Sequence, residues 1–138
     1  MSVEQNKAAF KRIIEEVFNK GDLSLIPELV ATNYVNASAG NIEGQEGFKQ
    51  YITMIRTAFP DMHITIDDMV GEEDKLAVQI SVTGTFTGKY LDFEPTGNKV
   101  NMKQAVFHRF SNGKQVEVTN YANQLEMLQQ MGIIPPTG

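Results

Sequence analysis

The sequence predicts an α+β domain in which helices pack on the concave face of a curved antiparallel sheet. Two observations support this prediction. Apolar residues recur with a helical period of 3.6 before Pro60 and alternate with a period of two after it. Further on, Asn112-Gly113 separates two long alternating runs, as the turn of a β-hairpin does, and a short amphipathic helix follows. The chain has 138 residues, and we expect one domain over residues 1–138.

Composition narrows the classes of function. The hydrophobic content of 41% is that of a globular protein, and 12 basic against 17 acidic side chains give a net charge of −5. This charge argues against nucleic acid as a partner, because phosphate binding needs a basic surface. The sequence has no cysteine, which excludes disulfides and thiolate metal sites. It also has neither a membrane-spanning apolar run nor the apolar region of a signal peptide, so we expect a cytoplasmic protein.

Three helices are expected before Pro60. In the first, apolar residues such as Phe10, Ile13 and Val17 follow helical spacing, and Gly21 supplies the usual left-handed cap. Pro60 ends the third helix, because a proline disfavours helical geometry in the residue before it. The expected elements are helices over residues 3–19, 23–31 and 44–59, with a short strand over residues 33–36 and a loop bracketed by Gly40 and Gly44.

The strands after Pro60 form the predicted sheet. Two strands, over residues 62–70 and 75–86, precede the hairpin centred on Asn112-Gly113. An uninterrupted count outward from that turn pairs Phe110 with Gln115 and His108 with Glu117. Because side chains alternate, one face then carries Met102, Gln104, Val106, His108, Glu117, Thr119, Tyr121 and Asn123. A sheet face this polar is typical of the floor of a ligand pocket.

Two groups of residues on this face are candidates for chemistry. Glu117 opposite His108 would fix the imidazole tautomer and raise its basicity, as a general base requires; a solvated polar pair near the turn is the alternative. Donors on Gln104, Tyr121 and Asn123 would hold a carbonyl or enolate oxygen, and a satisfied buried network is their alternative.

Other polar residues are expected to be structural. His63 is interpreted as an exposed histidine on a strand. The acidic residues Asp67, Asp68, Glu72, Glu73 and Asp74 are interpreted as a solvated turn. Neither set has the spacing of metal ligands, and we expect no metal and no cofactor.

Short motifs lie along nearly the whole chain. They are FNKGD at residues 18–22, Phe59-Pro60-Asp61, Gly84-Thr85 followed by Gly88, Pro95-Thr96-Gly97, Asn112-Gly113-Lys114 and Gln129-Gln130-Met131-Gly132. In this order they resemble the SnoaL-like polyketide cyclase family of the nuclear-transport-factor-2-like superfamily. The resemblance implies a cone-shaped half-barrel, and a homodimer that pairs through the outer face of the sheet.

The resemblance also implies an activity and a set of site residues. Characterised members cyclise aromatic polyketide esters by an intramolecular aldol reaction, without cofactor or metal. Their proposed acid/base aspartate, at the start of the last helix, corresponds to Asn123 in this chain. A tryptophan common in the family corresponds to Thr119, a histidine on the first strand to Asn36, and the histidine of the later strand is matched loosely by His108.

We therefore expect a protein that binds a compact, partly apolar carbonyl compound and turns it over by proton transfer. The expected catalytic residues are His108, Asn123 and Glu117, and the expected substrate-binding residues are Gln104, Tyr121, Thr119, Asn36, Tyr34, Tyr51 and Phe59. A non-catalytic carrier or sensor is one alternative. An isomerase or epoxide hydrolase is another, and the isomerase would use Glu117 as its buried carboxylate.

Overall fold

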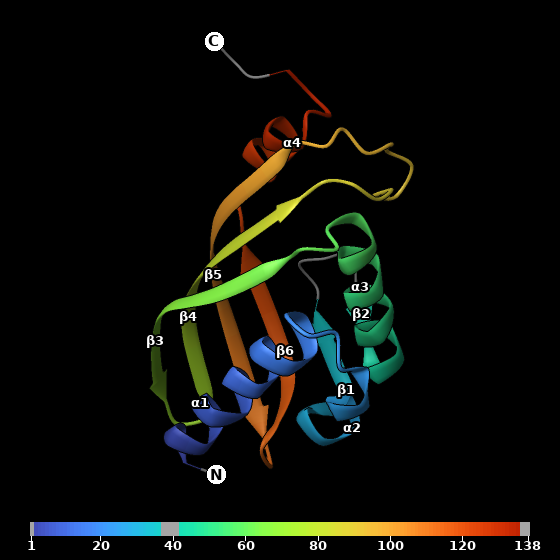
Figure 1. Cartoon of the computed structure of the whole chain (residues 1–138). Helices are drawn as coiled ribbons and strands as arrows, with labels where there is room; N and C mark the ends of the chain where they lie inside the picture. Colours follow the sequence, from blue (N-terminus) through green and yellow to red (C-terminus); the bar gives the residue numbers. More distant parts are fainter. Residues whose placement is uncertain (1, 37–41, 136–138) are drawn as a thin grey trace.

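One curved, unclosed sheet organises the molecule, and helices cover its concave side (Figure 1). The computed structural model describes residues 2–36 and 42–135, so the predicted loop at Gly40 lies outside the described residues. Within this part of the chain the sheet has six strands in the order β2-β1-β6-β5-β4-β3. The predicted α+β half-barrel is confirmed.

The helices follow the predicted order with two changes of detail. The first continues from an α-helical into a π-helical segment, and the second is shorter than predicted because a strand begins at Val30. The helical elements are α1 (Val3–Arg12), the π-helix η1 (Ile13–Phe18), the 3-10 helix η2 (Leu23–Leu25), α2 (Ile26–Leu29), α3 (Gly44–Ala58) and α4 (Gln124–Met131). A capping box of Ser2 and Gln5 starts α1, and Gly132 ends α4 in the left-handed conformation.

The strands include one pairing that the sequence pattern did not predict. They are β1 (Val30–Asn36), β2 (Ile42–Glu43), β3 (His63–Glu72), β4 (Lys75–Thr85), β5 (Lys99–Ser111) and β6 (Lys114–Tyr121). Strands β3 to β6 form an antiparallel meander, as predicted. Strand β1, however, pairs with β6 in parallel, a contact that the prediction of an antiparallel sheet did not include.

A bulge changes the register of the β5–β6 hairpin. The turn lies at Asn112-Gly113, where both residues have positive φ, and Phe110 pairs with Gln115, as predicted. Arg109 then pairs with Glu117, which leaves Val116 as an extra residue in β6. Beyond the bulge, every side chain of β6 therefore lies on the opposite face of the sheet from the one that an uninterrupted count assigns to it. The predicted pairing of His108 with Glu117 is therefore wrong, and His108 pairs with Val118.

The core lies between the sheet and the helices in two clusters. The larger joins α1, η1 and α3 to the concave face of the sheet, with Phe10, Val17 and Ile52 among its buried members. The smaller lies at the other end of the sheet and includes Phe86 and Met131. Between these two clusters, the side chains on the concave face leave a cavity.

Candidate functional site

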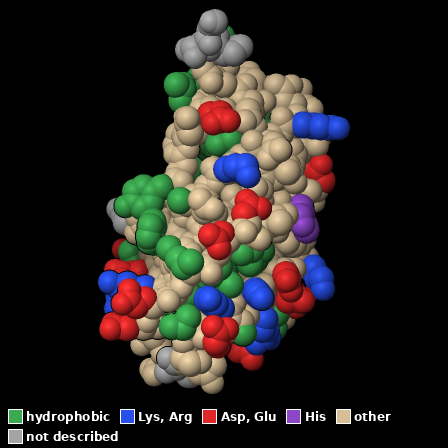
Figure 2. Space-filling view, turned by 90° about the vertical axis from the view of Figure 1, so that its left-hand side faces the viewer, with side chains coloured by type: hydrophobic (Ala, Val, Ile, Leu, Met, Phe, Trp, Pro, Cys, Tyr) green, Lys and Arg blue, Asp and Glu red, His purple; other side chains and the backbone are tan. Residues whose placement is uncertain are grey.

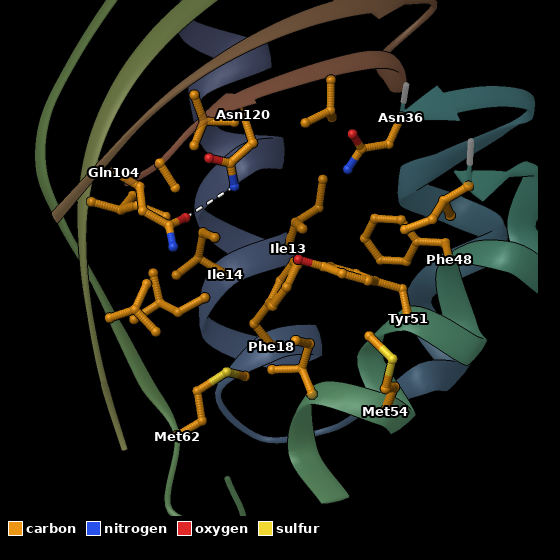
Figure 3. Close-up of a pocket in the computed structure, with 18 of the residues that line it drawn as sticks. Ile13, Ile14, Phe18, Asn36, Phe48, Tyr51, Met54, Met62, Gln104 and Asn120 are labelled. Atoms are coloured by element: carbon orange, nitrogen blue, oxygen red, sulfur yellow. Dashed lines mark hydrogen bonds between the residues drawn. The ribbon is translucent and has the colours of Figure 1, made fainter. Parts of the chain in front are cut away.

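A cavity of about 910 Å³ lies under the helices on the concave face of the sheet. Its walls are mainly aliphatic, aromatic and methionine side chains from α1, η1, α3 and strands β3 to β6 (Figure 3). Examples of these are Ile13, Ile14, Phe18, Phe48, Met54, Met62, Met102 and Val106. A cavity of this size and polarity, with a few polar groups, is typical of a site for a small organic molecule.

Exposure distinguishes the mouth of the cavity from its inner end. The lining residues Glu43, Gln50, Leu91 and Gln124 are exposed and mark the mouth. At the inner end the lining residues are buried, and they include Phe10, Tyr34, His108 and Gln115. A ligand would therefore enter past the mouth and place one end beside His108.

An amide pair forms one polar patch in the cavity wall. The side-chain nitrogen of Asn120, on β6, donates a hydrogen bond to Oε1 of Gln104, on β5, over 2.9 Å (Figure 3). This bond orients the Gln104 carboxamide and directs its oxygen toward Asn120. The amide nitrogen of Gln104 is then left to donate to a ligand.

Tyrosine and asparagine side chains form a second polar patch, opposite the amide pair. Tyr51 extends from α3 with its hydroxyl toward the middle of the cavity, and Asn36 reaches in from β1 (Figure 3). Burial raises the pKa of Tyr51 to about 12 and also raises the pKa of Tyr34. Both phenols therefore stay protonated at neutral pH and remain hydrogen-bond donors.

His108 lies at the inner end of the cavity in apolar surroundings. It is 6% exposed, and its ring centroid is 4.4 Å from that of Phe10. Burial lowers the pKa of His108 to about 3, and the nearby Gln115 side chain offsets only part of this effect. The imidazole is thus neutral at pH 7.

Three expected site residues lie outside the cavity, because the bulge turns them outward. Glu117, Thr119 and Tyr121 are exposed on the convex face of the sheet. The Glu117 carboxylate accepts a hydrogen bond from Nε of Arg109, and Tyr121 packs edge-on against Phe107. None of the three faces His108, and none lines the cavity.

Asn123 also lies outside the cavity lining, at the start of α4. Its side-chain oxygen accepts a hydrogen bond from the backbone N–H of Glu126 over 3.0 Å, which is the role of a helix N-cap. The residue that the resemblance places at the acid/base position is therefore exposed and caps a helix in this chain.

The other expected residues do line the cavity, together with residues that the sequence did not indicate. Tyr34, Asn36, Tyr51, Phe59, Gln104 and His108 all contribute to it. Gln115 and Asn120 are polar lining residues that we did not predict. Asn120 follows the bulge, which brings it to the cavity side, whereas Gln115 precedes the bulge, opposite Phe110, and lies on the predicted face. The signal that points to Asn120 is the apolar pair Val116 and Val118, which would face solvent in an unbulged hairpin.

The surface residues agree with their structural interpretation. His63 is exposed, as expected, and most of the acidic residues between Asp67 and Asp74 are exposed too. The side of the molecule next to β3 carries Asp and Glu interspersed with Lys and Arg (Figure 2). In residues 2–36 and 42–135, no three His, Asp or Glu side chains form a group that could hold a metal ion. Nor does any helix in these ranges have the length and apolar character needed to cross a membrane.

Comparisons with known proteins agree with this geometry. The model of the SnoaL-like polyketide cyclase family matches residues 8–131. One similar structure is AclR from Streptomyces galilaeus, described as a candidate hydroxylase, with 27% identity and a TM-score of 0.84 over 99% of this chain and 87% of that chain. Another is IdmH from Streptomyces antibioticus, described as a candidate polyketide cyclase, with 26% identity and a TM-score of 0.78 over 93% of this chain and 99% of that chain. TsrD from Streptomyces laurentii, at 18% identity and a TM-score of 0.88 over 97% of this chain and 99% of that chain, shares the fold. No curated protein sequence matches the chain.

Proposed function

The chain belongs to the SnoaL-like polyketide cyclase family, and on this premise we propose that it binds a compact, mostly apolar carbonyl compound and cyclises it by proton transfer. The description of IdmH as a candidate polyketide cyclase supports this proposal, since IdmH is 26% identical to this chain. In such a reaction a base takes the proton beside one carbonyl, and the enolate carbon attacks a second carbonyl of the same molecule. The proton then returns to the new alkoxide.

The observation that carries the proposal is the oriented Gln104–Asn120 amide pair in an otherwise apolar wall. A carbonyl oxygen of the ligand would accept a hydrogen bond from the Gln104 amide nitrogen. That bond would strengthen as negative charge develops on the oxygen in the enolate, which is how an oxyanion hole promotes such steps. The Tyr51 hydroxyl would supply a donor from the opposite wall.

His108 is the proposed proton acceptor, since it is the one histidine among the described residues that line the cavity. Its neutral imidazole has a nitrogen lone pair that can take a proton. A general base works best when its pKa is near the working pH, and a pKa of about 3 makes His108 a weak base before the ligand binds. Developing negative charge on a bound enolate would raise that pKa.

This same low pKa favours a second candidate function, a non-catalytic carrier or sensor for the same class of ligand. A carrier needs the cavity and its hydrogen-bond donors but no base. An isomerase that relies on a buried carboxylate gains no support, because Glu117 is exposed on the convex face.

A ligand screen with matched variants would test the proposal. Purified protein would be screened by thermal shift against aromatic polyketide esters, steroid ketones and small terpenoid ketones. A ligand at a hundredfold excess over its Kd stabilises the protein by about 2.7 kcal/mol. For each compound that binds, Gln104→Met should weaken affinity roughly 3- to 10-fold, as expected for one hydrogen bond. Thr119→Val, on the convex face, is the control and should leave affinity unchanged.

A turnover assay would then separate the enzyme from the carrier. If His108 moves the proton, His108→Leu should lower turnover of a bound compound by roughly 10²–10⁴-fold. Bound compounds that the wild-type protein leaves chemically unchanged would support the carrier. Binding that ignores Gln104→Met would refute the proposed site.

We also propose that two copies pair through the convex face of β5 and β6. The exposed aromatic pair of Phe107 and Tyr121 supports this, because large apolar side chains exposed together often mark an interface. Light scattering tests it, and a monomer at micromolar concentration would refute it. We keep the cytoplasm as the proposed location, which fractionation of cells that produce the protein would check.

A further inference from the structure

The inner end of the cavity contains polar atoms that the protein leaves unpaired. Gln115 is 2% exposed and His108 is 6% exposed. Within the described part of the chain, Oε1 of Gln115 and both ring nitrogens of His108 have no partner at hydrogen-bond geometry, although the two side chains lie near each other. Unpaired buried polar groups of this kind cost free energy, so three of them at the end of one cavity indicate a place where a ligand pairs with them.

These atoms lie close together. Gln115 pairs with Phe110 just before the bulge, and its side chain lies near both His108 and Tyr34. All three residues line the cavity. The Phe10 ring covers the imidazole on the side of α1. The inner end is thus a small polar recess closed by apolar side chains.

The donors and acceptors of the recess select a chemical group. A neutral imidazole offers one N–H donor and one acceptor nitrogen, and the Gln115 oxygen is a second acceptor. A hydroxyl group pairs with two members of this set, because it accepts from the imidazole N–H and donates to the Gln115 oxygen. A carbonyl oxygen can only accept, and would leave the Gln115 oxygen unpaired. A carboxylate would bring a buried charge beside that oxygen, which is costly.

We propose that this recess, formed by His108 and Gln115, is a subsite for a hydroxyl group of the ligand. The inference rests on the binding part of the proposed function, since it concerns the same cavity. A hydroxyl held by His108 lies far from the carbonyl held by Gln104, so a ligand of this kind is bound as a carrier would bind it and is not deprotonated by His108. The subsite narrows the ligand class to hydroxylated carbonyl compounds that enter with the hydroxyl end first.

The spacing of the two polar sites sets the shape of this ligand. Gln104 and His108 are four residues apart on β5 and face the same side. At about 3.4 Å per residue, their Cα atoms are roughly 13 Å apart along the strand. One molecule can reach both only if its carbonyl and hydroxyl groups lie at opposite ends of its skeleton, so this inference replaces the compact ligand of the proposed function with an elongated one.

Three steroids of the same skeleton would test the subsite. Testosterone has an enone at one end and a hydroxyl at the other, androstenedione has a ketone in place of that hydroxyl, and 17-deoxytestosterone has neither. Their Kd values would be measured by calorimetry on the wild-type protein, Gln115→Met and Gln104→Met. The two variants make the same change at the two polar sites, so each is the control for the other.

The subsite predicts a specific pattern of affinities. Testosterone should bind the wild-type protein roughly 3- to 10-fold more tightly than either other steroid. Gln115→Met should abolish this preference while leaving the Kd of 17-deoxytestosterone unchanged. Gln104→Met should weaken all three steroids by a similar factor and keep the preference.

Other outcomes separate the two proposals. Equal binding of the three steroids to the wild-type protein, or a preference that survives Gln115→Met, overturns the hydroxyl subsite alone. Affinities that Gln104→Met does not change overturn the proposed carbonyl site, even if the hydroxyl preference remains. Absence of binding by all three steroids overturns both for ligands of this shape.

Discussion

The two faces of the β5–β6 hairpin carry similar residue types in different environments. On the concave face, Gln104, Asn120 and His108 are set among apolar side chains, where Asn120 donates a hydrogen bond to Gln104 and Phe10 packs on the His108 ring. On the convex face, Arg109 and Glu117 pair in contact with water. A polar group on the first face costs free energy if it lacks a partner, whereas one on the second is solvated in any case. The face, more than the residue type, therefore decides which groups are suited to recognise a ligand.

Val118→Asp should have the largest effect on this difference. The bulge turns Val118 inward, opposite His108, and leaves it 8% exposed, whereas an uninterrupted hairpin would turn it outward. Burying a carboxylate without a partner costs several kcal/mol, so we expect the variant to lose most of its stability or fail to fold. Urea unfolding followed by circular dichroism measures this. A loss below about 1 kcal/mol would mean that the bulge does not turn Val118 inward.

The same substitution at two phenylalanines of β5 compares the concave face with the convex face. Phe110 is 2% exposed and Phe107 is 52% exposed. Phe110→Ala should lower the free energy of unfolding by about 3–5 kcal/mol through loss of burial and creation of a cavity. Phe107→Ala should cost about 1 kcal/mol or less in the monomer, from its contact with Tyr121. Equal losses at low protein concentration would contradict the assignment of faces, and a loss for Phe107→Ala that grows with concentration would support the dimer.

The stability of the protein in acid should depend on His108, the histidine of the concave face. Because the folded-state pKa of His108 is about 3, against an ordinary value near 6.5, the unfolded chain takes up a proton that the folded chain does not. Stability should therefore fall as pH decreases from about 6.5 toward 3, by roughly 1.4 kcal/mol per pH unit from this group. His108→Leu should remove that part of the slope in unfolding curves recorded across this range. His63→Leu, at an exposed position, should leave it in place, and equal slopes in both variants would contradict the burial of His108.

The smallest effect is expected at the ion pair of the convex face. The side chains of Arg109 and Glu117 are 44% and 57% exposed. Glu117→Gln should change the free energy of unfolding by less than about 1 kcal/mol, since exposed ion pairs contribute little. It should also leave ligand affinity unchanged in the thermal-shift screen. A tenfold loss of affinity would place Glu117 in the site after all.

The sequence predicted the elements better than their details. The change of period at Pro60 gave the order of helices and strands, and Asn112-Gly113 gave the turn with its first two residue pairs. Both signals are local, so they are visible in the chain itself. The parallel contact of β1 with β6 depends on segments far apart in the sequence, and no local pattern indicates it.

The bulge limited what could be predicted of the site. No glycine marks it, and an uninterrupted count from the turn placed Glu117, Thr119 and Tyr121 in the pocket. Gln104 and His108 lie on β5, where the face was assigned correctly, and both do line the cavity. Beyond the bulge, the residues of β6 that face the cavity are the sequence neighbours of those predicted, which is why Asn120 was missed. Gln115 precedes the bulge and already lay on the predicted face. The uninterrupted count places the apolar side chain of Val118 on the solvent face, and this conflict would have indicated the one-residue shift.

The parallel contact of β1 with β6 also bears on how the protein is made. Val30 pairs with Gln115 and Asn36 with Val118, so β1, which also pairs with the short β2, has its second partner about 80 residues further along the sequence. During synthesis, this pairing cannot form until β6 has left the ribosome. Contacts between such distant segments slow folding, because a long loop must close before they form. We therefore expect the β3–β4–β5 meander to form first and nascent chains that end before β6 to depend on chaperones.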